Sequence, residues 1–207
     1  RGYAVLQVNF RGSWGYGKNF TTAGFKQWGK KMQDDITDGA TWLVDQGVAD
    51  KDKIAIFGSS YGGYSALAGV TFTPDVYACG IAYVGPSNLF TLLNNLPSYW
   101  EPEKEMLFEM IGHPVADSVL LYNASPVFHT ENIKVPLFIA QGGNDPRVRK
   151  EESEQMVDAL RSRDQHVVYM LKENEGHGFK LAENRLESYK AMMGFLAEQM
   201  QATSIKP

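Results

Sequence analysis

One pentapeptide of this 207-residue chain has the residue types and spacing of a serine nucleophile. Ser60 is the central residue of GSSYG at 58–62, after the apolar run 53–57 and before the small-residue segment 62–70. The run predicts a buried strand and the segment a closely packed helix, so the serine lies at a sharp strand-to-helix turn. Such a turn strains the serine backbone and exposes its hydroxyl. We expect glycine at 58 and 62 because a Cβ there would clash across the turn.

The chain also supplies the partners that a serine nucleophile requires. A hydroxyl is a poor nucleophile at neutral pH, so Ser60 needs a general base, and the base needs an orienting acid. In hydrolases with this turn the order is Ser, Asp, His. Asp145 follows the strand-like run 137–141, and His177 follows the run 167–171 with glycine on both sides. Ligands of open α/β sheets bind at the carboxyl ends of such strands, so we predict a catalytic triad of Ser60, Asp145 and His177.

The other histidines and nearby acids have simpler explanations. No other histidine has flanking glycines at a strand end, so we interpret these as surface or core residues: His113, His129 and His166. The rival acids lie in or beside predicted helices, where a solvated face or the helix dipole accounts for them: Asp34, Asp35, Asp38, Asp158 and Asp164.

Four motifs in order resemble the catalytic domain of the prolyl oligopeptidase family of serine peptidases. They occupy residues 9–17, 58–63, 142–148 and 176–179, and the resemblance covers about residues 3–200. The most similar subgroup is the acylaminoacyl-peptidase and dipeptidyl-aminopeptidase branch. The resemblance implies an α/β-hydrolase fold, with a mostly parallel central sheet, helices on both faces and the first strands lacking. It implies one catalytic domain over residues 1–207.

The resemblance further implies an oxyanion hole and a carbonyl anchor. The backbone N–H of Tyr61 and the hydroxyl of Tyr16 match the two oxyanion donors of the family. The alternative for Tyr16 is a turn tyrosine in a glycine-rich loop. Arg147 matches a position that anchors a substrate carbonyl in some members, and its alternative is an ordinary surface arginine.

The same resemblance places the S1 pocket after the predicted strand 80–84. Four residues would give it an apolar lining: Pro86, Leu89, Phe90 and Leu93. An equally good interpretation is that these residues form the buried face of a short helix.

Composition excludes several classes of protein. A net charge of −4 and a pI near 5.6 argue against a nucleic-acid partner, since phosphate binding requires a basic patch. No apolar run approaches the roughly 18 residues that span a membrane. The only cysteine, Cys79, excludes an intrachain disulfide. The histidines have no ligand spacing, so we expect neither a metal nor any other cofactor.

The chain begins at Arg1, directly before a predicted strand at 3–10. The family's His-Gly-Gly-Pro-like loop and its N-terminal β-propeller are absent, so we interpret the sequence as part of a longer chain. A signal peptide would lie upstream, and the compartment is therefore not readable. Five predicted strands leave one sheet edge exposed, where missing strands or a second copy would pair, giving a homo-oligomer in the second case. A C-terminal helix at 181–200 is expected to pack through the stripe Leu186, Tyr189, Met193, Leu196 and Met200.

The function predicted from these features is a serine hydrolase that cleaves short peptides through an acyl-enzyme. The alternative is a carboxylesterase acting on small acyl esters, because the same triad cleaves esters more easily. A non-catalytic binding module is disfavoured, since all three triad members stand in intact motifs. The expected partner is a small peptide or ester substrate.

Overall fold

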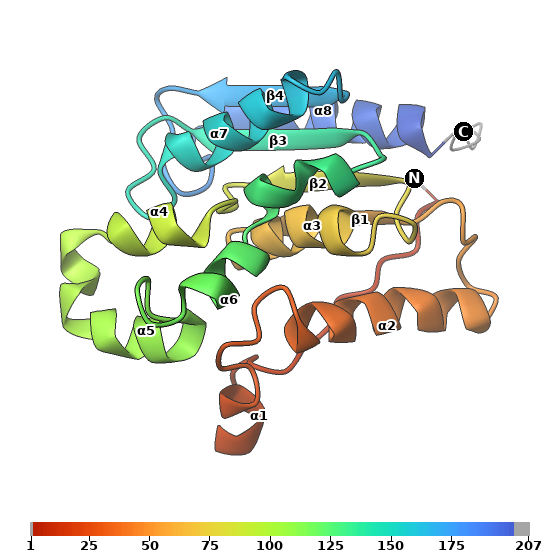
Figure 1. Ribbon diagram of the computed structural model, residues 1–207. Helices are drawn as coiled ribbons and strands as arrows, with labels where there is room; N and C mark the ends of the chain where they lie inside the picture. The colour runs from red at the N-terminus through yellow and green to blue at the C-terminus, as the bar shows by residue number, and fades with distance from the viewer. Residues whose placement is uncertain (1, 201–207) are drawn as a thin grey trace.

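Four parallel strands form the central sheet of the computed structural model, which describes residues 2–200 (Figure 1). Their order in the sheet follows their order in the chain: β1 (Ala55–Ser59), β2 (Cys79–Tyr83), β3 (Leu137–Gly142) and β4 (Val167–Lys172). The register pairs Phe57 with Ile81 and Ile81 with Phe138. All four carboxyl ends therefore meet at one edge of the sheet, as ligand-binding α/β sheets require.

Helices cover both faces of this sheet, which explains why every residue of β3 is buried. On one face α2 (Lys31–Asp45), α3 (Tyr61–Phe72) and α7 (Lys150–Arg161) share a hydrophobic cluster with the strands. On the other face α8 (Ala182–Gln199) packs through Met192 and Phe195 (Figure 1). Among residues 2–200 no helix is long and apolar enough to cross a membrane.

The connection between β2 and β3 builds a second layer beyond the carboxyl ends of the strands (Figure 1). Its elements are short: α4 (Leu89–Asn94), the 3₁₀ helix η1 (Ser98–Glu103), α5 (Lys104–Ile111), α6 (Ser118–Asn123) and the 3₁₀ helix η2 (Pro126–Asn132). Together with Tyr64 of α3, its buried side chains form a separate hydrophobic cluster. The short helix α1 (Lys18–Thr22) precedes α2.

The strand predicted at 3–10 is wrong. This segment has no regular secondary structure, and the side chain of Val5 is exposed. Leu6 and Val8 lie against Gly39 of α2, where an added Cβ would come within 3.2 Å and 2.9 Å of them. A strand requires a neighbour for its ladder of hydrogen bonds, and among the described residues none lies beside this segment. The sheet therefore has four strands rather than five.

The C-terminal helix exists, but only part of its predicted stripe faces the sheet. Leu196 and Met200 pack as predicted, against the cluster that contains Met192 and Phe195. Leu186 and Tyr189 are exposed, and in the first half of the helix Asn184 and Ser188 are the buried residues. The orientation follows from two contacts outside the helix. Phe195 packs on Phe138 of β3 with 5.7 Å between the ring centroids, and the amide of Asn184 donates a hydrogen bond to buried Glu175. The apolar periodicity of the helix alone does not predict either contact.

Candidate active site

Ser60 connects β1 to α3 in a strained conformation, with φ 58° and ψ −118°. Its N–H donates to the carbonyl of Tyr83 at 2.9 Å, and its own carbonyl accepts from the N–H of Tyr64 at 3.0 Å. Non-glycine residues rarely adopt positive φ, and such outliers are held only where the surrounding structure fixes them. The predicted strand-to-helix turn is present at this serine.

Glycine is required at this turn, although not at both predicted positions. A Cβ at Gly58 would lie 2.3 Å from the carbonyl oxygen of Gly62, which no rearrangement of a side chain could relieve. A Cβ at Gly62 would meet nothing within 4 Å, so the predicted clash at that residue is wrong. The second close approach involves Gly63, where a Cβ would lie 2.8 Å from both Gly85 Cα and the Tyr83 carbonyl. The turn therefore depends on Gly58 and on the tight contact of Gly63 with Gly85.

His177 lies between Ser60 and Asp145. It belongs to the loop after β4, and its Nε2 is 2.9 Å from Ser60 Oγ while its Nδ1 is 2.8 Å from Asp145 Oδ2. An ionised carboxylate only accepts hydrogen bonds, so the ring proton resides on Nδ1 and Nε2 is free to accept from the serine hydroxyl. The structure thus joins the three predicted residues in one chain of hydrogen bonds.

The Asp145 side chain is fully buried, with 0% of it exposed. Its Oδ1 accepts from the N–H groups of Arg147 and Val148 at 2.9 Å and 3.0 Å, and its Oδ2 also accepts from Gln141 Nε2 at 3.4 Å. A buried carboxylate is costly unless it is hydrogen-bonded, and these donors meet that requirement. They also fix which oxygen faces the imidazole of His177.

The two residues predicted for the oxyanion hole lie in different settings. Tyr61 is the first residue of α3, and its N–H makes no hydrogen bond within residues 2–200, as is usual for a first helical turn. Its ring packs against Trp28 and Phe10, with centroid distances of 4.6 Å and 4.9 Å. Tyr16 lies in the loop before α1 with an exposed side chain, and its ring is 5.3 Å from that of Phe20.

An ion pair attaches the start of the Tyr16 loop to α2. The N–H and Nε of Arg11 both donate to Asp35 Oδ2 at 2.8 Å, and Nη2 donates to Oδ1 at 2.6 Å. The hydrogen bond from Arg11 lowers the pKa of the Asp35 carboxyl despite partial burial. The sequence predicts only a helix-dipole role for Asp35, because a contact over 24 residues has no signal in helical periodicity.

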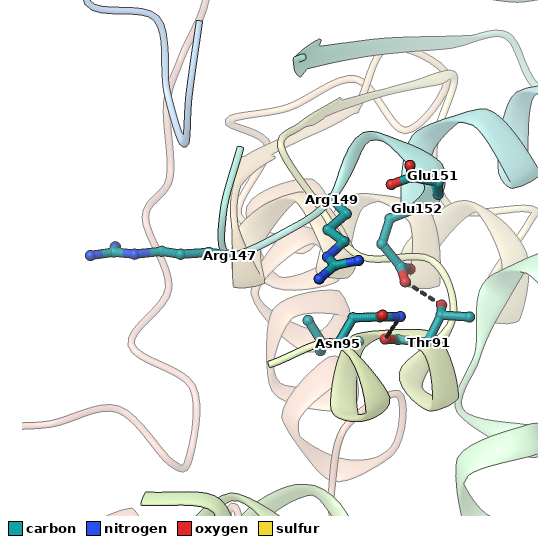
Figure 2. Close-up of a pocket in the computed structure, with 7 residues that line it drawn as sticks. Thr91, Asn95, Arg147, Arg149, Glu151 and Glu152 are labelled. Carbon is teal, nitrogen blue, oxygen red and sulfur yellow. Dashed lines mark hydrogen bonds between the residues drawn. The ribbon is translucent and has the colours of Figure 1, made fainter. Parts of the chain in front are cut away.

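A cavity of about 310 Å³ lies between α4 and the segment that follows Asp145 (Figure 2). Arg149 extends towards Asn95 of α4, whereas Arg147 points away from the cavity (Figure 2). Arg147 instead donates from Nε to the Tyr99 hydroxyl at 3.4 Å, and its guanidinium lies 5.8 Å from the centre of the Trp100 ring. The lining residues are Thr91, Leu92, Asn95, Arg147, Arg149, Glu151 and Glu152.

The four residues predicted for an apolar S1 pocket do not line this cavity. Leu89 and Leu93 are 0% and 2% exposed and belong to the hydrophobic cluster around Tyr64. Pro86 is buried and Phe90 is half-buried against the same cluster. The structure places Leu89 and Leu93 on the buried face of a short helix, which was the second interpretation.

Comparison with known proteins identifies the family to which this geometry belongs. Residues 1–203 match the prolyl oligopeptidase family. This chain belongs to that family. It is 50% identical over 200 residues to dipeptidyl aminopeptidase BIII of Pseudoxanthomonas mexicana, which covers 96% of this chain and 29% of the relative. The predicted family membership is confirmed.

Solved structures of related peptidases have the same fold. A puromycin-hydrolyzing peptidase of Mycobacterium tuberculosis superposes with a TM-score of 0.88 at 33% identity, covering 93% of this chain and 29% of that one. An acylaminoacyl peptidase of Pyrococcus horikoshii gives 0.84 at 26% identity, covering 97% and 33%. The predicted α/β-hydrolase fold is confirmed. The chain spans about 30% of the length of these family members.

Proposed function

We propose that this chain carries the catalytic centre of a serine peptidase that cleaves short peptides. The observation that carries the proposal is the hydrogen-bonded series Ser60–His177–Asp145 at the carboxyl edge of the sheet. Family membership supports it, because the relatives that match most of this chain are named as peptidases.

The geometry suits acyl transfer in two steps. Ser60 Oγ attacks the substrate carbonyl carbon while His177 Nε2 takes the hydroxyl proton, and Asp145 stabilises the resulting imidazolium. The imidazolium then gives its proton to the leaving amine, which departs and leaves an acyl-serine. A water molecule hydrolyses this ester by the same route, with His177 again acting as base.

The tetrahedral intermediate requires donors for its oxyanion. We assign this role to the N–H of Tyr61, which has no other partner among the described residues, and to the hydroxyl of Tyr16. Arg11 and Asp35 would hold the Tyr16 loop in place, since they attach its first residues to α2.

Tyr16→Phe is therefore expected to lower kcat by roughly 100- to 1000-fold, the usual loss for one oxyanion donor. Binding of substrate should change little, because the ring remains. Steady-state kinetics on a chromogenic peptide anilide measure both constants. Tyr122→Phe, which removes another exposed tyrosine hydroxyl, on α6, is the matched control. A kcat within threefold of the wild-type value would remove Tyr16 from the oxyanion hole.

Substrate selection is proposed to involve Arg147 and apolar residues in and before α4. Arg147 is exposed two residues after Asp145, so its guanidinium can reach a substrate carbonyl. Phe90 is half-buried on α4 beside the cavity-lining Thr91, over the cluster that contains Leu89 and Leu93. Pro86 is buried in the turn before α4. The relatives favour a peptide over an ester as substrate.

A substrate panel tests this assignment. We expect this chain to cleave aminoacyl, dipeptidyl or N-acyl-aminoacyl p-nitroanilides, and the reaction to disappear in Ser60→Ala. The panel identifies which N-terminal group is accepted. Cleavage of p-nitrophenyl esters with no anilide cleavage would refute the peptidase proposal for this chain.

We further propose that the edge of β1 with no strand partner among residues 2–200 pairs with a second copy of the chain. Within the described sheet β1 bonds only to β2, and Phe57 on this strand is exposed. An unpaired edge is a template for pairing between chains. Sedimentation equilibrium gives the molar mass, and a monomer at all concentrations would overturn this part of the proposal.

A further inference from the structure

Glu175 is a buried carboxylate that neither the triad nor the cavity uses. Only 3% of the residue is exposed. Its Oε2 accepts from the N–H of Lys180 at 2.7 Å, and its Oε1 accepts from the N–H of Leu181 at 3.0 Å and from Asn184 Nδ2 at 2.8 Å. Burial alone would raise the pKa of this carboxyl, but the three donors hold it below its ordinary value, so the group is ionised at neutral pH.

These bonds close the loop that carries His177. Glu175 lies two residues before His177. Its carboxylate oxygens accept from the backbone N–H groups of Lys180 and Leu181, three and four residues after His177. The far end of the loop leads directly into α8, whose N-cap residue Leu181 has no capping side chain of its own. Glu175 thus holds the two residues that precede α8, and its charge lies near the helix N-terminus, where an anion is stabilising.

The loop is also fixed on its other sides. The backbone carbonyl of Glu175 accepts from the N–H of Asn144, the residue before Asp145, at 2.8 Å. The N–H of Phe179 donates to the Tyr83 hydroxyl. Gly142 at the end of β3 approaches Gly176 so closely that a Cβ would lie 2.1 Å from the Gly176 carbonyl oxygen. One residue, Glu175, therefore contacts both the loop of the acid and the loop of the base.

We propose that Glu175 is a positioning residue that sets the distance of the His177 imidazole from Ser60 and Asp145. This inference rests on the proposed function, in which His177 is the general base. The helix α8 is anchored to the sheet by Met192 and Phe195, so it is a fixed support. The carboxylate ties the short glycine-containing loop to that support. Without it, two backbone N–H groups lose their acceptor and the loop regains freedom.

The chain offers a matched control in Glu152 for thermal stability and for the NMR signal of His177, but not for KM, because Glu152 lines the cavity. This residue is also 3% exposed, and it too accepts from two backbone N–H groups, those of Ser87 and Asn88, both at 2.9 Å. It also accepts from the Thr91 hydroxyl. Its network joins α7 to the turn before α4 and does not include the histidine loop. Loss of either carboxylate therefore removes a similar set of hydrogen bonds, while only Glu175 adjoins His177.

The experiment compares Glu175→Gln and Glu152→Gln with the unaltered chain. An amide of the same shape presents an NH₂ group to N–H donors, so both variants lose thermal stability. In Glu175→Gln we expect kcat on a peptide anilide to fall about 10- to 100-fold with KM within twofold, because a small misplacement of a catalytic group costs about that much. In the same variant we also expect the far-downfield proton NMR signal of His177 Nδ1–H to shift or broaden. That signal is assigned by its loss in His177→Gln, and it should be unchanged in Glu152→Gln.

The outcomes distinguish a positioning role of Glu175 from a purely structural role. An unchanged kcat and Nδ1–H signal in Glu175→Gln overturn the inference, as does an equal change of the signal in Glu152→Gln. If Glu175→Gln does not fold, Glu175→Asp is measured in the same way, since its shorter side chain keeps the charge but cannot reach all three donors. Activity retained in Ser60→Ala would instead refute the proposed function. With Ser60→Ala inactive, a result against Glu175 refutes the positioning role alone.

Discussion

Ser60→Ala is expected to lower turnover by roughly 10⁵- to 10⁶-fold while leaving the fold intact. Alanine has no hydroxyl to form the acyl-enzyme, so only the oxyanion donors and substrate binding would still accelerate attack by water. The backbone bonds of Ser60 to Tyr83 and Tyr64 do not involve the side chain and should survive. Steady-state kinetics on a p-nitroanilide, with circular dichroism for the fold, measure both parts.

A second substitution separates loss of the nucleophile from loss of structure. Alanine at φ 58° is as strained as serine, whereas glycine adopts this region freely. Ser60→Gly should therefore be equally inactive yet more stable, by about 1 kcal/mol, because the strain is relieved. Thermal unfolding of the three proteins tests this order. Activity above 1% of the wild-type value in Ser60→Ala or Ser60→Gly would contradict the nucleophile assignment.

Local sequence signals predicted the elements that carry the triad. The apolar run before the acid appears as β3, the run before the histidine as β4, and the segment after the serine as α3. β3 and α3 are continuous apolar or small-residue stretches with glycine beside them, which is the pattern of fully buried elements, whereas β4 is apolar but only half-buried. Since parallel strands end at one edge, the positions of Ser60, Asp145 and His177 after such strands also predicted their proximity.

Features that depend on distant partners could not be predicted in this way. The segment at 3–10 has the composition of a strand, but a strand also needs a neighbouring strand to bond to. The periodicity of a segment does not show whether such a neighbour is present. The first half of the buried face of α8 was misassigned for the same reason, since Phe138 and Glu175 determine it from outside the helix. The polar lining of the cavity, including Arg149 and Glu152, arises where α4 meets the start of α7. The spacing of these residues in the sequence does not predict that contact.

Asp145→Asn is expected to lower kcat by about 10⁴-fold although it alters a single atom. Oδ1 of Asp145 faces the N–H groups of Arg147 and Val148, so the remaining carbonyl oxygen of asparagine should take that position. The NH₂ group then occupies the place of Oδ2 and faces His177 Nδ1. A donor there requires Nδ1 to accept, which moves the ring proton to Nε2. The imidazole would present an N–H to Ser60 and could not take its proton.

Kinetics and NMR together distinguish this tautomer effect from a change of fold. The kcat of Asp145→Asn is measured on the same anilide, and the downfield Nδ1–H signal of His177 should disappear. Asp158→Asn, an exposed acid on α7, is the control and should leave both unchanged. A loss of less than tenfold in Asp145→Asn would mean that the buried carboxylate serves packing rather than the base. Since two backbone donors fix its orientation, we expect the full loss.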